Sequence, residues 1–200
     1  MPWITHIPYE EAKGELKKIY DKIKGPDNYL DNILMIHGLR PHTLQAHMRL
    51  YKNVLHHPNN TLPKWLLEIL GVYTSMLNGC EYCMEHHFNG LKRLLDDDKR
   101  AERIRKALEN ETFEDAFEEK EIVLLEYAKA LTENPSEIDP SLIDEIRSHG
   151  YTDGQVLEVN QMVAYFAYAN RTVLGLGVEI KGDILGLSPS SDDPDDWSHR

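Results

Sequence analysis

Apolar residues recur along the chain at spacings of three and four, with charged residues between them. This spacing is typical of amphipathic helices, which bury one face. Such segments cover most of the chain, at residues 8–24, 32–38, 41–56, 61–77, 81–95, 101–110, 113–132, 140–148 and 153–172. No segment alternates apolar and polar residues between hairpin turns, so the sequence predicts an all-α fold.

Two of the predicted helices, 61–77 and 153–172, contain the longest apolar stretches and are expected to pack side by side. The Asn78-Gly79 pair predicts the end of the first helix, because both residue types favour helix C-termini. The second helix repeats features of the first, and aligning the two places Asn170 opposite Cys80. The sequence therefore predicts a compact multi-helix domain with a weak internal two-fold repeat.

Composition divides the chain into a helical domain, 1–187, and an acidic tail, 188–200. The whole chain is 41% hydrophobic and 28% charged, which is enough apolar surface for a packed core. The tail is rich in serine, proline and aspartate, a composition typical of disordered segments. We expect the tail to be disordered and to contribute no chemistry.

Charge and hydropathy limit the partners of the chain. It has 22 basic and 34 acidic residues and a formal net charge of -12, so it should repel nucleic acids and anionic membranes. No apolar run approaches the roughly 20 residues that span a bilayer, and the first residues lack the pattern of a secretion signal. The sequence therefore predicts a cytoplasmic protein with neither nucleic acid nor membrane as a partner.

Both cysteines stand in one Cys-x-x-Cys pair, Cys80 and Cys83, at the start of the predicted helix 81–95. The positive end of a helix dipole favours thiolates, and two cysteines at this spacing can form a disulfide. His87 follows Cys83 by one helical turn and can serve as its base. Glu68, on the preceding helix, is the carboxylate expected to orient that imidazole. These four residues form the predicted catalytic group.

Other interpretations of the same region stay open. Glu68 can instead be the solvent-facing residue of a one-sided helix. His86 points about 100° away from His87 on a helix and is interpreted as a surface or interface residue. Tyr82 can line the pocket or only pack. The remaining eight histidines show no recurring ligand spacing and are interpreted as structural or solvated: His6, His37, His42, His47, His56, His57, His149 and His199.

A bare Cys-x-x-Cys pair also occurs in other kinds of protein. A thioredoxin-like pair requires a βαβ environment, which the helical pattern does not provide. A zinc site would need four ligands and could use Cys80, Cys83 and two of the histidines. The zinc site therefore remains an alternative to thiol chemistry.

Eleven residues separate Glu68 from the segment Cys80-Glu81-Tyr82-Cys83, and His87 follows that segment. This arrangement resembles the alkylhydroperoxidase D-like group of the carboxymuconolactone decarboxylase superfamily. The residues before the pair, Leu77-Asn78-Gly79, match as well. Further features look like the peroxidase-related branch of that group, namely Ile7-Pro8, Gly14, Tyr20, the segment 165–171 and Gly175-Leu176-Gly177.

The resemblance implies an all-helical fold, assembly into homo-oligomers and reduction of hydroperoxides by a cysteine pair. It assigns Cys83 as the cysteine that attacks the peroxide and becomes sulfenic acid, and Cys80 as its resolving partner and proton donor. His87 and Glu68 match the imidazole and carboxylate of the proton relay. No FAD, haem or metal is implied. The chain departs from the best-known members at Tyr82, where they have a histidine.

We therefore predict an antioxidant oxidoreductase that reduces organic hydroperoxides and is restored by a separate thiol or dithiol reductant. Two alternatives belong to other classes. One is a non-catalytic redox-sensing or zinc-binding helical module. A general disulfide reductase lies between the peroxidase and this module. The other is a carboxymuconolactone decarboxylase-like enzyme, which the cysteine pair argues against because the decarboxylases of the superfamily lack it.

Overall fold

The computed structural model describes residues 2–189, 191, 193 and 195–200, and over these residues the regular structure is entirely helical. The predicted all-α fold class is therefore confirmed. The α-helices are α1 (Gly14–Ile23), α2 (Asn32–Ile36), α3 (Pro41–Tyr51), α4 (Lys64–Leu77), α5 (Glu81–Leu95), α6 (Asp98–Asn110), α7 (Glu119–Glu133), α8 (Pro140–Ser148) and α9 (Asp153–Leu176). None of these helices is long and apolar enough to cross a membrane.

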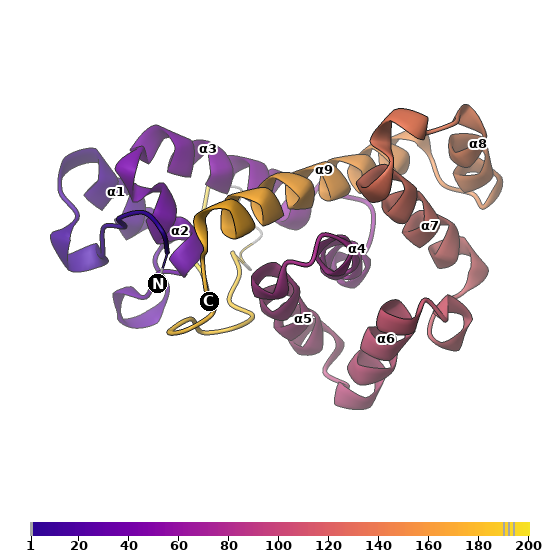
Figure 1. Ribbon diagram of the computed structural model, residues 1–200, viewed down its shortest axis with the longest axis horizontal. Coiled ribbons are helices and arrows are strands. Elements are labelled where there is room, and N and C mark those ends of the chain that lie inside the picture. The colour runs from indigo at the N-terminus through magenta and orange to yellow at the C-terminus, as the bar shows by residue number, and fades with distance from the viewer. Residues whose placement is uncertain (1, 190, 192, 194) are drawn as a thin grey trace.

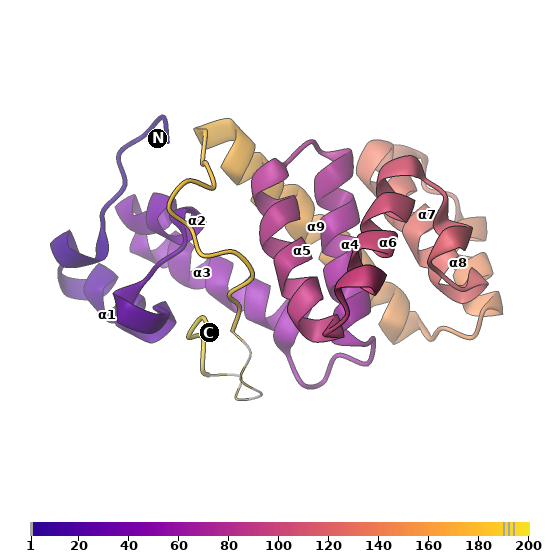
Figure 2. The same ribbon diagram turned by 90° about the horizontal axis from the view of Figure 1, so that it is seen from below.

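Helix α9 runs along the molecule, from α8 at one end to the N-terminal helices at the other (Figure 1). Helix α4 packs against both α9 and α5, and these three helices form the centre of the fold (Figure 2). Ten consecutive residues of α4, 66–75, are buried, so the helix is enclosed on all sides. The predicted packing of the two most apolar helices, now α4 and α9, is confirmed.

The close approach of α4 and α9 depends on a glycine. Gly71 of α4 faces the ring of Phe166 on α9, and a Cβ atom at position 71 would overlap that ring. Both residues lie in the buried core. Only hydrogen at this position lets the aromatic ring fill the space between the helices, as close packing of interiors requires.

The turn from α4 to α5 places the cysteine pair. Gly79 has a φ of 67°, its N–H donates to Met76, and the N–H of Cys80 donates to Ser75 at 2.8 Å. This pattern of hydrogen bonds is a Schellman motif, and it ends α4 where the Asn78-Gly79 pair predicted the helix to stop. Cys80 is then the N-cap of α5, and Cys83 lies in its first turn.

The described residues of the 188–200 segment are packed against the domain, in contrast to the expected disorder. Trp197 and His199 are each only 4% exposed. The N–H of His199 donates to Ile23 at the end of α1, and that of Arg200 donates to Ser188. Residues 190, 192 and 194 lie outside the described part. Buried aromatic side chains outweigh the acidic composition of the segment, and for its described residues the expectation of disorder is wrong.

Candidate active site

Glu68 and His87 face each other across α4 and α5. The Nδ1–H of His87 donates to Oε2 of Glu68 at 2.7 Å, and the carboxylate is buried, with the residue only 3% exposed. The alternative of a solvent-facing Glu68 is therefore wrong, and the predicted contact is present. Because the hydrogen bond holds Nδ1, the other ring nitrogen of His87 is left to exchange protons.

Cys80 and Cys83 are both free, buried thiols. A hydrogen bond from the Cys83 thiol lowers the pKa of Cys80, and the backbone N–H of Cys83 and the amide of Asn170 act in the same direction against burial. The same thiol–thiol hydrogen bond, followed by burial, raises the pKa of Cys83 well above its ordinary value. Cys80 is therefore the thiol that loses its proton more readily, and the thiol proton of Cys83 is then held between the two sulfurs.

Asn170 of α9 supports the thiol pair from the opposite side. Its side chain is fully buried, donates to the Ser75 hydroxyl at 3.1 Å and accepts from Asn78 at 3.0 Å. Both partners belong to the end of α4, so the amide is fixed where it meets the two sulfurs. The internal repeat had aligned Asn170 with Cys80, but its hydrogen bonds to the thiols were not predicted.

A cavity of about 50 Å³ opens beside these residues, enough space for a few water molecules. Cys83, Glu68 and His87 line one side of it, and Tyr51, Tyr165 and Phe166 provide an aromatic wall. Cys80 is not among the lining residues. The cavity thus brings together three of the four predicted catalytic residues and exposes only one of the two sulfurs to a bound molecule.

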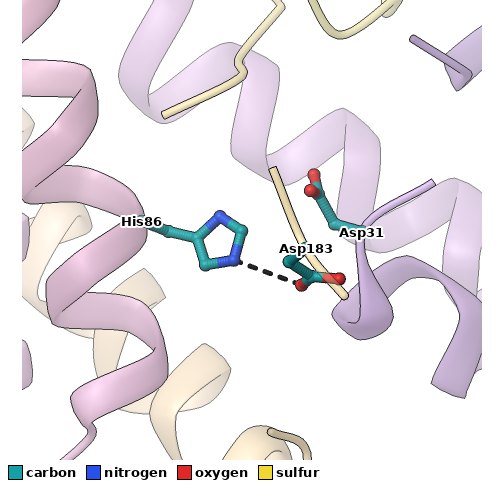
Figure 3. A group of neighbouring side chains, drawn as sticks. All are labelled: Asp31, His86 and Asp183. Carbon is teal, nitrogen blue, oxygen red and sulfur yellow. Dashed lines mark hydrogen bonds and ion pairs between the residues drawn. The ribbon is translucent and has the colours of Figure 1, made fainter. Parts of the chain in front are cut away.

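His86 also faces the interior, so its interpretation as a surface or interface residue is wrong. Its side chain is 10% exposed, and its Nε2 lies 3.2 Å from Oδ2 of Asp183 (Figure 3). The Tyr82 ring packs against His86 at a tilt of 30°, with ring centroids 4.5 Å apart, and its hydroxyl donates to the same carboxylate. Tyr82 therefore both packs and lines the cavity, which settles the question about its position.

Several residues at the cavity were not predicted from the sequence. Asp31 lines it, and Asp183 contacts the lining residues Tyr82 and His86. Both aspartates lie on irregular segments, and no periodic pattern marks them. His47 and His199, interpreted as structural or solvated, both line the cavity. His47 has an Nδ1 atom without a hydrogen-bond partner among the described residues, and burial lowers its pKa to about 3, so the ring stays neutral.

The described residues do not form the zinc site considered for the cysteine pair. Over this part of the chain, the only group of three or more metal-ligating side chains that lie close together is Asp31, His86 and Asp183. Neither cysteine belongs to it. The thiols instead bond to each other and to Asn170, which is the arrangement of a redox pair.

These features define a class of protein: an all-helical domain in which a Cys-x-x-Cys pair begins a helix and a buried Glu–His pair faces the same cavity. Residues 41–130, which contain all four predicted catalytic residues, match the model of the carboxymuconolactone decarboxylase family. This match covers less than half of the chain, and it agrees with the resemblance that the motif indicated.

Solved structures share the fold at low sequence identity. The alkylhydroperoxidase AhpD core from Ralstonia eutropha JMP134, an uncharacterized peroxidase-related protein, has a TM-score of 0.75 and 18% identity over 89% of this chain and 91% of its own. A peroxidase-related protein from Silicibacter sp. TM1040 has a TM-score of 0.65 and 22% identity over 74% of each chain.

The debrominase Bmp8 in complex with 2,3,4-tribromopyrrole also matches, with a TM-score of 0.65 and 19% identity over 84% of each chain. Comparison with curated protein sequences gave no match. At these identities the structural likeness establishes the fold, and the activity has to be argued from the site.

Proposed function

We propose that the protein is a thiol peroxidase that reduces a small hydroperoxide at Cys83. The observation that carries this proposal is the shared cavity: the Cys83 thiol and the hydrogen-bonded Glu68–His87 pair line the same enclosed space. A nucleophile, a base and a group that orients the base are the parts that thiol catalysis needs.

The reaction consumes one hydroperoxide and oxidises the two thiols to a disulfide. Cys83 loses its proton to Cys80, or to His87 through a cavity water, and its sulfur attacks the terminal oxygen of the hydroperoxide. The O–O bond breaks, Cys83 becomes sulfenic acid, and the departing alkoxide takes up the proton and leaves as an alcohol. Donation of that proton leaves Cys80 as a thiolate, which attacks the Cys83 sulfur. The displaced hydroxide takes a proton from solvent by way of His87 and leaves as water. A separate thiol or dithiol supplies two electrons to reduce the disulfide.

Access and acidity favour different cysteines as the nucleophile. The pKa of Cys80 is lowered and that of Cys83 is raised, so Cys80 is the more acidic thiol of the pair. Only Cys83, however, lines the cavity. A peroxide has to reach the sulfur that it oxidises, so we assign the attack to Cys83 and assign Cys80 as proton acceptor and resolving thiol.

The size of the cavity limits the substrate. A space of about 50 Å³ accommodates hydrogen peroxide or a short alkyl hydroperoxide without rearrangement of the walls. The aromatic residues Tyr51, Tyr165 and Phe166 exclude bulk water and suit an alkyl group.

Assembly into homo-oligomers and a cytoplasmic location remain predictions, since they rest on the resemblance and on composition.

The test is rapid mixing of the reduced protein with tert-butyl hydroperoxide, followed by mass spectrometry of both cysteines. We expect a Cys80–Cys83 disulfide in the native chain, and a dimedone-trapped sulfenic acid on Cys83 in Cys80→Ser. Cys83→Ser should lose turnover with a dithiol completely, while the control His149→Ala, remote from the cavity, should retain it. Full activity in Cys83→Ser, or sulfenic acid at Cys80 in that variant, would contradict the assignment.

A further inference from the structure

We propose that Asp31, His86, Asp183 and His199 form a binding site for a divalent metal cation, on the side of the cavity that the peroxidase chemistry does not use. The ligand atoms of Asp31, His86 and Asp183 all lie within 4.8 Å of one another. They come from three separate parts of the chain: the start of α2, helix α5 and the segment after α9 (Figure 3).

The spacing of the ligand atoms suits a single ion. His86 Nε2 and Asp183 Oδ2 are 3.2 Å apart, and His199 Nε2 and Asp31 Oδ2 are 3.7 Å apart. Ligands that bind one ion at about 2.1 Å lie roughly 3.0 to 3.4 Å from each other in octahedral or tetrahedral geometry. Small side-chain rotations therefore bring these groups to coordination distance.

The orientation of His199 independently points to a cation. Its Nδ1–H donates to the carbonyl oxygen of Ile23 at 3.1 Å, so in the neutral ring the lone pair of Nε2 faces the Asp31 carboxylate. Two electron-rich atoms face each other at 3.7 Å, a separation that a cation between them makes favourable. A backbone carbonyl that fixes one histidine nitrogen is also the usual support of a metal-binding histidine.

The carboxylates are supported in the same way. Tyr29 donates its hydroxyl to Oδ1 of Asp31 at 2.9 Å, which leaves Oδ2 toward His199. The Tyr82 hydroxyl and the backbone N–H of Asn32 donate to Asp183. These hydrogen bonds fix the carboxylates from outside the site, as the partners of metal ligands commonly do.

The charge of the site calls for compensation. The side chains of Asp31 and Asp183 are only 6% and 1% exposed, and within the described residues neither pairs with a lysine or arginine. Within the described residues their ion-pair partners are His86 and His199, which carry a charge only when they are protonated. A divalent cation would neutralise both carboxylates, as buried charges require.

The donor atoms define the class of metal. Two carboxylates with two imidazoles suit Mn²⁺, Fe²⁺ or Zn²⁺ and do not select a thiol-seeking ion such as Cu⁺. His47, which keeps a buried nitrogen without a partner among the described residues, lines the same cavity. The cysteine pair lies outside the group, so the cation would leave the thiols free.

The experiment is titration of the chelator-treated, full-length chain with Mn²⁺, followed by the loss of the free-ion signal in electron paramagnetic resonance. Mn²⁺ is the probe because thiols bind it poorly. We expect one bound ion per chain, and at least 10-fold weaker binding in His86→Ala and Asp31→Asn, with thermal unfolding used to verify that both variants are folded. His87→Ala and the exposed Asp115→Asn are the controls and should bind as the native chain does.

Each result decides the proposal without any measurement of peroxide turnover. Absence of Mn²⁺ binding by the native chain at millimolar concentration overturns it. Undiminished binding in folded His86→Ala and Asp31→Asn also overturns it, because the ion would then bind elsewhere. Loss of binding in these two variants with retention in both controls supports the site, whatever the peroxide experiment shows.

Discussion

His86 and His87 are consecutive residues of α5, yet each pairs with a different carboxylate on a different side of the cavity. His87 meets Glu68 of the neighbouring helix α4 in one hydrogen bond of 2.7 Å. His86 meets Asp183 of the segment after α9, within a network that includes Tyr82. Consecutive side chains on a helix point about 100° apart, so the two rings contact different carboxylates.

The two pairs differ in what their surroundings allow. Around His87, one carboxylate fixes one ring nitrogen, and a small cavity with a thiol lies beside it, an arrangement suited to moving a proton. Around His86, a second buried carboxylate, Asp31, lies close by, and the local charge is suited to holding a cation. A histidine beside one carboxylate is therefore suited to proton transfer, whereas a histidine beside two carboxylates is suited to holding a cation.

Removing the His87 imidazole gives the largest expected effect in this comparison. His87→Ala removes the base, so we expect peroxide turnover to fall about 10² to 10³-fold while Mn²⁺ binding stays intact. Glu68→Gln keeps the shape of the side chain but weakens the orientation of the ring, and a smaller fall is expected. Steady-state turnover with tert-butyl hydroperoxide and a dithiol measures both. Turnover in His87→Ala within three-fold of the native value would show that Cys80 alone accepts the Cys83 proton.

The helices behind the Glu68–His87 pair can be tested through packing. Gly71→Ala places a methyl group against the Phe166 ring and forces α4 and α9 apart, so we expect a loss of about 1 to 3 kcal/mol in the free energy of unfolding. Gly175→Ala is the matched control, because nothing lies within 4 Å of its added Cβ in α9. It should stabilise the helix by about 0.5 to 1 kcal/mol. Urea unfolding followed by circular dichroism measures both, and equal effects would argue against the packing role of Gly71.

The Asp31 side of the cavity should respond to pH. Burial raises the pKa of Asp31, so the stability linked to its protonation is present below the pKa of the unfolded chain and is lost as pH rises through the folded pKa. At neutral pH without metal, Asp31→Asn should therefore be more stable than the native chain by about 1 kcal/mol. The difference should shrink as pH falls and the carboxyl group of the native chain becomes protonated.

Added Mn²⁺ should reverse this order at neutral pH, because a bound ion stabilises only the chain that can hold it. Thermal unfolding at both pH values, with and without Mn²⁺, makes the comparison. A less stable Asp31→Asn at neutral pH without metal would indicate that His199 already compensates the Asp31 carboxylate.

The sequence predicted the Glu68–His87 pair because both residues lie on strongly periodic helices joined by a short turn. Helical spacing places His87 one turn after Cys83, and the Asn78-Gly79 turn folds α4 back along α5. The same spacing gave a wrong interpretation of His86, since one helix cannot show that a distant segment covers its second face. Periodicity specifies which face a residue occupies, but only the tertiary fold specifies what meets that face.

By itself the sequence determined the all-α fold, the packing of α4 against α9 and the position of the thiols at a helix start, because each follows from local periodicity and turn chemistry. The tertiary structure alone brought Asp31, Asp183 and His199 together. Those residues are far apart along the chain and lie on segments without regular repeats. The acidic composition of the last segment predicted disorder, while the burial of Trp197 and His199 decided its path. Burial depends on the surface that the rest of the fold provides, and no local pattern contains that information.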